Sequence, residues 1–150
     1  MCQACDENAQ PLTSGPEVTK MNPVVKALWL EDLRSGNFEQ GTGVLHRALN
    51  EGSASDHTFC CLGVLSERAV AEGVCERVVH PDTGTFAGVF NYVDADGYRE
   101  HHYLTPAVQA WAGTDSDPYL KINGRTQRVS QHNDEGCTFE QIADAIEEQL

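Results

Sequence analysis

Glycine and proline residues mark the ends of the periodic segments in this 150-residue sequence, and they keep each segment short. Pro23 and Pro106 stand at the start of two apolar patterns with helical spacing, and Gly36, Gly73 and Gly113 follow the ends of three such patterns. Proline is favoured at the first position of a helix and glycine just beyond its last residue. The sequence therefore predicts three short helices, over residues 23–35, 59–72 and 106–112.

A fourth helix and two hairpins complete the pattern. Thr138 and Gln141 form a capping box ahead of an apolar stripe that predicts a helix over residues 139–149. Strand-like residues run from 76 to 104 and fold back on themselves around an Asp-Ala-Asp-Gly turn. The dipeptide Asn123–Gly124 is a strong signal for a second hairpin.

The fold class that these elements predict is α+β in a single domain. About four helices pack on one small, mostly antiparallel sheet made by residues 76–104 and 119–130. The domain covers residues 22–150, and residues 1–21 form a polar N-terminal tail without an apolar period. The predicted core consists of apolar residues from all of these elements: Val25, Leu28, Leu33, Leu45, Phe59, Leu62, Leu65, Phe90, Leu104, Trp111, Ile122, Phe139, Ile142 and Ile146.

The stretch FCCLGVLSERA, residues 59–69, begins the second helix with two adjacent cysteines. Cys61 shares a four-residue period with later apolar residues of the stretch, which places it in the apolar stripe and Cys60 at its edge. We therefore interpret the pair as small apolar side chains of the core, with Asp56 or Thr58 as the helix cap. The alternative is a reactive thiol at Cys60, where the dipole of the first helical turn favours a thiolate.

The charge of the chain is strongly negative, with 23 acidic residues against 10 basic ones and a net charge of −13. Such a chain repels nucleic acid phosphates, so direct binding of DNA or RNA is not expected and a basic protein is the more compatible partner. No apolar run approaches the roughly 18 residues of a membrane span, and the N-terminus lacks the basic and apolar regions of a signal peptide. We expect a cytoplasmic protein without membrane contact, whose six cysteines are thiols or metal ligands.

Cys2 and Cys5 have the spacing of half a zinc site. Zinc at these two residues, with the other ligands unidentified, is the one cofactor hypothesis that the sequence supports, and no catalytic residue is predicted. His101 and His102 are expected on opposite faces of a strand, where they cannot share one metal ion. The remaining histidines are expected in loops: His46, His57, His80 and His132.

Four segments together resemble a family of small proteins encoded by actinobacterial and other phages and prophages: NPVVKALWLEDLRSGNFEQGTGVLHR, FCCLGVLSERA, YLTPAVQAWAG and HNDEGCTFEQIADAIEEQ. The resemblance covers residues 22–150 and rests on the FCCLGVL and closing ND-x-G blocks in combination. It implies a phage gene product acting in the cytoplasm of an infected bacterial cell, and it implies no catalytic residue because the family has no assigned function. Asn133, Asp134 and Gly136 are expected to form a turn before Thr138, with a positive φ at Gly136.

Three functions are compatible with these observations, and the absence of a catalytic motif favours the first. The first is a small acidic phage accessory protein, not an enzyme, that binds and modulates a host protein. Its candidate binding residues lie on the exposed face of the last helix: Glu140, Asp144, Glu147 and Glu148. The second is a metal-dependent protein or enzyme centred on cysteine or histidine. The third is a self-associating structural module, a homodimer joined through the tyrosines of the first hairpin: Tyr92, Tyr98 and Tyr103.

Overall fold

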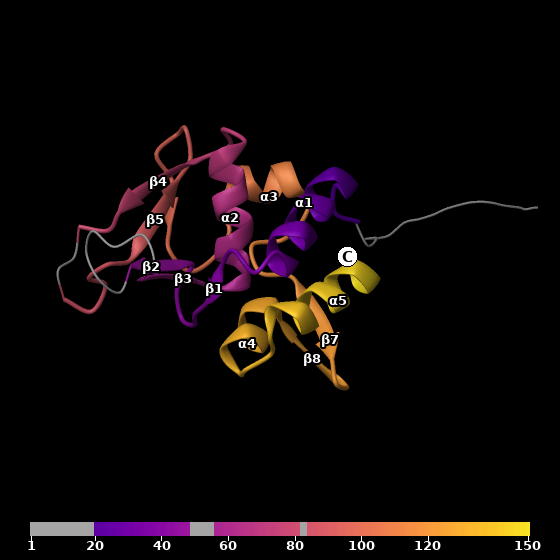
Figure 1. The fold of residues 1–150 in the computed structure, drawn as a ribbon. Coiled ribbons are helices and arrows are strands. Elements are labelled where there is room, and N and C mark those ends of the chain that lie inside the picture. Colours follow the sequence, from indigo (N-terminus) through magenta and orange to yellow (C-terminus); the bar gives the residue numbers. More distant parts are fainter. Residues whose placement is uncertain (1–19, 49–55, 82–83) are drawn as a thin grey trace, which may run out of the picture.

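The structure, a computed structural model, describes residues 20–48, 56–81 and 84–150 of the chain (Figure 1). Within these residues the fold is α+β, with five helices and three small sheets. The helices are α1 (Pro23–Arg34), α2 (Cys61–Ala71), α3 (Pro106–Ala112), α4 (Val129–Asp134) and α5 (Phe139–Gln149). The strands are β1 (Glu39–Gln40), β2 (His46–Ala48), β3 (His57–Phe59), β4 (Glu76–Val79), β5 (Phe90–Val93), β6 (Arg99–Glu100), β7 (Tyr119–Ile122) and β8 (Arg125–Arg128).

The described strands form three sheets, where the sequence predicted one. In the first sheet β3 lies between β1, which runs parallel to it, and β2, which runs antiparallel. In the second sheet β5 lies between β4 and β6, and both pairs are antiparallel. Strands β7 and β8 form the hairpin predicted at Asn123–Gly124. An isolated antiparallel bridge between Arg47 and Val89 joins the first two sheets.

Helix α2 lies at the centre of the domain. Figure 1 shows it between the sheet of β4 and β5 on one side and helices α1 and α3 on the other. The residues from Cys61 to Ser66 are all buried, which is the pattern of a helix surrounded by protein rather than one with a solvent-facing side. Gly63 lies against the backbone carbonyl of Leu45, where any side chain would collide with that carbonyl. The apolar run of α2 therefore forms the core that the other elements cover.

The first turn of α2 is capped by residues from other parts of the chain. The N-cap residue is Cys60, whose side chain makes no capping hydrogen bond, so the predicted caps Asp56 and Thr58 are wrong. Thr58 instead lies in β3, directly before the helix. The N–H of Cys61 donates to Oδ1 of Asn133 over 3.1 Å, and Nε1 of Trp29 donates to the Cys61 carbonyl over 2.9 Å. The Asn133 side chain thus satisfies a backbone N–H that a local cap satisfies in other helices.

Three of the predicted helices begin at the predicted caps. Asn22 accepts hydrogen bonds from the first turn of α1, Thr105 does so for α3, and Thr138 forms its capping box with Gln141 at α5. Helix α4 was not predicted, and it occupies part of the segment interpreted as a turn. Gly136 has the expected positive φ, of 105°.

The predicted core is mostly buried, with two kinds of exception. Leu28, Phe90, Trp111 and Ile122 are only half-buried. Several residues absent from the prediction are fully enclosed, among them Trp29, His46 and Tyr92. Tyr92 is therefore unable to contribute to a dimer face, whereas Tyr98 and Tyr103 are exposed.

The N-terminal boundary of the domain includes Met21, which the sequence analysis assigned to the tail. Its side chain is buried, and its N–H donates to the carbonyl of Leu150 over 3.3 Å. Residues 1–19 of the predicted tail lie outside the described residues.

Replacement of Asn133 by alanine is expected to destabilise the whole domain. Asn133 is 1% exposed, and its amide also accepts from Nε2 of Gln40 over 2.9 Å and donates to the carbonyl of Gly41 over 2.8 Å. Alanine leaves the buried N–H of Cys61 and the half-buried carbonyl of Gly41 without these partners, so we expect the free energy of unfolding in urea to fall by about 2–4 kcal/mol. Asn133→Asp keeps the acceptor for the Cys61 N–H but loses the donor to the Gly41 carbonyl. Its free energy of unfolding should therefore lie between those of the wild-type protein and Asn133→Ala. A loss below about 0.5 kcal/mol for Asn133→Ala would contradict this account.

Candidate histidine–carboxylate site

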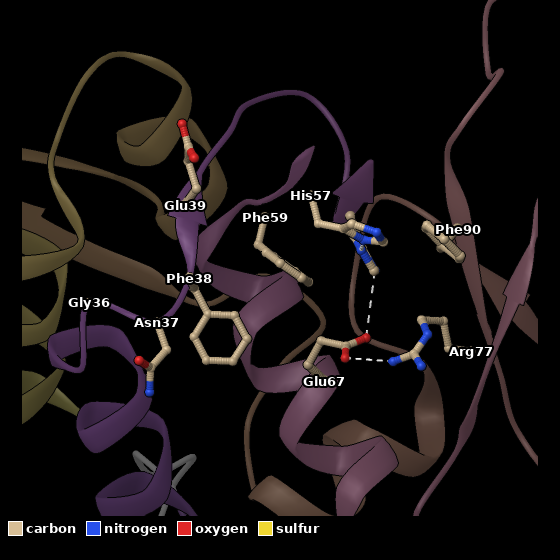
Figure 2. A pocket seen from close by; sticks show the side chains of 10 residues that line it. Gly36, Asn37, Phe38, Glu39, His57, Phe59, Glu67, Arg77 and Phe90 are labelled. Atoms are coloured by element: carbon tan, nitrogen blue, oxygen red, sulfur yellow. Dashed lines mark hydrogen bonds and ion pairs between the residues drawn. The ribbon is translucent and has the colours of Figure 1, made fainter. Parts of the chain in front are cut away.

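A pocket of about 820 Å³ opens between the segment that follows α1 and the first two sheets (Figure 2). Figure 2 shows aromatic, acidic and basic side chains around it. The lining residues come from the α1–β1 segment, from β2 and β3, and from α2, β4 and β5: Gly36, Asn37, Phe38, Glu39, His46, His57, Phe59, Glu67, Arg77 and Phe90. Six elements, the strands β1 to β5 and the helix α2, therefore meet at this pocket.

His46 is enclosed between two aromatic rings. It stands opposite Phe59 in the antiparallel pairing of β2 with β3, and their ring centroids are 4.1 Å apart at an interplanar angle of 24°. Phe90 of β5 stacks on it with a centroid distance of 4.2 Å and an angle of 19°. The His46 side chain is 2% exposed, and burial lowers its pKa below the ordinary value of 6.5. His46 is therefore neutral at pH 7.

Glu67, on α2, accepts hydrogen bonds from two sides of the pocket. The hydroxyl of Tyr92 donates to Oε2 over 2.6 Å, and Nη1 of Arg77 donates to Oε1 over 2.6 Å. Nδ1 of His46 lies 3.6 Å from Oε2. Burial raises the pKa of Glu67, but the interactions with His46, Tyr92 and Arg77 outweigh burial and lower it to about 2. Glu67 is therefore an ionised carboxylate that can only accept hydrogen bonds.

The ionised state of Glu67 determines the hydrogen-bond directions in the neighbouring groups. Tyr92 has one hydroxyl proton and donates it to Glu67, so its oxygen accepts in the 3.1 Å contact with Nδ1 of His46. Burial and Glu67 hold the pKa of Tyr92 well above its ordinary value, which keeps that proton in place. Nδ1 of His46 must then carry the single proton of the neutral ring, and its Nε2 is an acceptor.

His57 completes this hydrogen-bond chain at the pocket wall. Its Nδ1 lies 2.6 Å from Nε2 of His46, and since Nε2 of His46 accepts, Nδ1 of His57 donates. The lone pair of neutral His57 is then on Nε2. His57 is half-buried and lines the pocket, and Nε2 has no hydrogen-bond partner among the residues that the structure describes. The chain from Glu67 to His57 thus presents one oriented, unpaired nitrogen acceptor at the pocket.

The sequence analysis missed this site because it placed the histidines in loops. His46 begins β2, His57 begins β3 and His132 lies in α4, whereas His80 follows the end of β4. The two site histidines come together only through the pairing of β2 with β3. Alternation of polar and apolar residues in these strands could have indicated the pairing, but three residues per strand give too weak a pattern.

The expectation that His101 and His102 face opposite sides of a strand is wrong. Strand β6 ends at Glu100, so the backbone bends at the two histidines and their alternation ends there. Their ring centroids are 4.2 Å apart, and His80 and Phe86 contact His101 edge to face at centroid distances of 5.1 Å and 4.7 Å. Burial and the neighbouring His102 and His80 lower the pKa of His101.

The two adjacent cysteines are buried, as predicted for core residues. Cys61 is 0% and Cys60 3% exposed. Cys60 lines a hollow of about 60 Å³ that His102 and Asp134 also line. Burial raises the pKa of the Cys60 thiol to about 12 and that of Cys61 well above its ordinary value, although backbone N–H groups of the first turn of α2 oppose the shift. These thiols are protonated at pH 7, which argues against the reactive-thiol alternative.

The zinc hypothesis falls outside the described residues, since Cys2 and Cys5 belong to residues 1–19. Over residues 20–48, 56–81 and 84–150, no group of three or more histidine, cysteine or acidic side chains could hold a metal ion.

The acidic face predicted on the last helix is partly neutralised by Arg34 of α1. The Arg34 guanidinium lies 2.8 Å from Asp144, 2.7 Å from Glu147 and 3.5 Å from Glu140. Glu148 is exposed and has no ion pair within the described part of the chain. The structure therefore brings three of the four candidate residues together, in a cluster that also contains a basic residue.

The fold and the pocket define an α+β domain with a histidine–carboxylate site at the junction of two small sheets. A family model described as a domain of unknown function (DUF8296) matches residues 21–150, so the chain belongs to this family. No curated protein and no solved structure matches the chain. Among the helices of the described residues, none has the length and apolar character required to cross a bilayer.

The stability of the protein is expected to decrease as the pH is lowered, because of His46. Its native pKa is below the unfolded value of 6.5, so below pH 6.5 the unfolded chain binds more protons at this residue than the native protein does. We expect the free energy of unfolding to decrease from pH 7 to about pH 5, by at most about 1.4 kcal/mol per pH unit for this one group. Denaturation of His46→Gln in urea across the same pH range should give a flatter profile.

His101 provides the control for this measurement, because its native pKa is also lowered. His101→Gln should remove only the share of the pH dependence that belongs to His101 and leave the share of His46. Parallel profiles for the wild-type protein and His46→Gln would contradict the assignment of a neutral, buried His46.

Proposed function

We propose that this protein is an acid–base enzyme in which His57 exchanges a proton with a substrate or a water molecule in the pocket. The observation that supports the proposal is the hydrogen-bond chain from Glu67 through Tyr92 and His46, which leaves Nε2 of His57 as an unpaired acceptor. A general base needs an oriented lone pair and a pKa near the working pH, and histidine supplies both. The proposal takes up the histidine-centred alternative from the sequence, without a metal.

The chemical step is a proton transfer that the chain can accommodate. Nε2 of His57 accepts a proton from water or a hydroxyl group, and the ring becomes an imidazolium ion. The proton on Nδ1 of His57 stays in its 2.6 Å hydrogen bond to Nε2 of His46, because burial keeps His46 neutral, and His57 returns to the neutral state when Nε2 gives up the proton to a leaving group or to water. The negative charge of the Glu67 carboxylate, 3.6 Å from Nδ1 of His46, favours the imidazolium ion on His57. His46 and Glu67 act here as positioning residues, and Glu67 remains ionised throughout.

Two measurements test this proposal. Nitrogen-15 NMR of the histidine rings at pH 8 should find the proton on Nδ1 of both His46 and His57. The p-nitrophenyl esters of acetate, glycine and phosphate then provide neutral, cationic and anionic substrates whose hydrolysis releases a coloured product. We expect hydrolysis of at least one ester, and a decrease of about 100-fold or more in kcat/KM for His57→Asn.

His101→Gln is the matched control, because it removes another partly exposed histidine that lies outside the pocket. Its kcat/KM should equal that of the wild-type protein. A proton on Nε2 of His57, equal activities of the two variants, or no hydrolysis of any of the three esters would overturn the proposal.

A second candidate function is the small acidic phage accessory protein that binds a host protein in the bacterial cytoplasm. The net charge of −13 supports it, together with the carboxylates of α5, whose side chains are 60–66% exposed where they contact Arg34. A basic surface on the host protein would pair with these carboxylates, and such binding weakens as salt rises.

Neutralisation of the α5 carboxylates tests this second candidate. Affinity capture from a bacterial lysate should retain a basic protein on the wild-type chain at low salt and lose it for Asp144→Asn, Glu147→Gln and Glu148→Gln combined. The control combines three exposed carboxylates from other elements, Glu31→Gln, Glu76→Gln and Asp115→Asn, and should retain the protein. Equal capture by the two triple variants would count against a role for α5.

A further inference from the structure

The lining of the pocket contains one more carboxylate than it contains basic side chains. Its charged lining residues are Glu39, Glu67 and Arg77. Arg77 donates to Glu67 over 2.6 Å, so these two charges compensate each other. Glu39 is exposed and makes no ion pair within the described residues. The carboxylates and the guanidinium of the lining therefore sum to one negative charge, which attracts cations.

The uncharged part of the pocket wall is aromatic. Phe38 is half-buried and packs edge to face with Phe59 at a centroid distance of 5.1 Å and an angle of 86°. Phe90, on the opposite side, stacks on His46 and also on His57, at 4.2 Å and 5.8 Å. Figure 2 shows Phe38 and Glu39 on one side of the pocket and Phe90 and Arg77 on the other. Aromatic faces attract cations and also accept flat apolar groups.

One hydrogen-bond acceptor in the pocket, Nε2 of His57, is available to a positively charged donor. Nε2 of His57 has a lone pair and no partner in the described part of the chain, as derived above. The Glu39 carboxylate is likewise an acceptor. A protonated amine supplies three N–H donors and one positive charge, which matches this set, whereas a carboxylate or phosphate would meet the excess negative charge.

From this arrangement we propose that the pocket binds a small organic cation that carries an ammonium group beside a flat apolar group. The apolar group lies along Phe38, and the ammonium group donates to Nε2 of His57 within the field of Glu39. The inference rests on the proposed function, since it names the class of substrate for the base at His57. It goes beyond that function because the preference for a cation depends on Glu39 and the aromatic wall and not on proton transfer.

Binding of three ring compounds of similar size tests the inference without any turnover. Benzylammonium, benzyl alcohol and benzoate differ in charge and share the ring, and their dissociation constants can be measured by NMR titration at pH 8. We expect benzylammonium to bind about tenfold more tightly than benzyl alcohol, and benzoate to bind most weakly. Glu39→Gln should weaken the binding of benzylammonium by about threefold or more.

Glu31→Gln is the matched control, because it removes an exposed carboxylate of α1 that does not line the pocket. It should leave the dissociation constant of benzylammonium unchanged. Benzoate binding as tightly as benzylammonium, absence of benzylammonium binding, or equal effects of the two variants would overturn the inference. These outcomes leave the NMR tautomers and the activity of His57 untouched, so failure of the inference is distinguishable from failure of the proposed function.

Discussion

The first turn of α2 is a buried helix end, and the rest of the domain is arranged to accommodate it. Its N–H groups cannot reach water, so protein acceptors must satisfy them. The Leu45 carbonyl accepts from Cys60, and Oδ1 of Asn133 accepts from Cys61. The contact with Leu45 requires a close approach, which Gly63 permits because it has no side chain to collide with Leu45. The segment before β2, the helix α4 and the start of α2 are thereby held together at one point.

This constraint explains why parts of the fold were predictable from the sequence and others were not. The caps Asn22, Thr105 and Thr138 act on the turn that follows each of them, so a local pattern is sufficient to predict α1, α3 and α5. The start of α2 and helix α4 depend on partners far away in the sequence. In α4, the N–H of Ser130 donates to the Asp117 side chain, 13 residues earlier. No local sequence pattern indicates such a distant partner, and for this reason part of α4 was interpreted as a turn.

The candidate site was less predictable than the fold because each of its members has an ordinary local role. His46 and His57 are 11 residues apart and face each other only because β2 and β3 pair in one register. A shift of this register by one residue would move His46 away from the side of the sheet on which Phe59 lies. Glu67 occupies the one stripe of α2 that is not fully enclosed, and in the sequence it has the appearance of a surface residue. The electrostatic character of the site therefore originates in tertiary packing.

The position of His46 between Phe59 and Phe90 has a consequence for how the protein loses its structure. Phe59 belongs to the first sheet and Phe90 to the second, and the bridge from Arg47 to Val89 crosses the same junction. Partial unfolding that separates these sheets would expose His46 to water, restore its ordinary protonation and interrupt the hydrogen-bond chain to His57. The chemistry of the pocket and the docking of the two sheets therefore form one cooperative unit, and a fragment that contains only one of the sheets would lack the site residues of the other sheet.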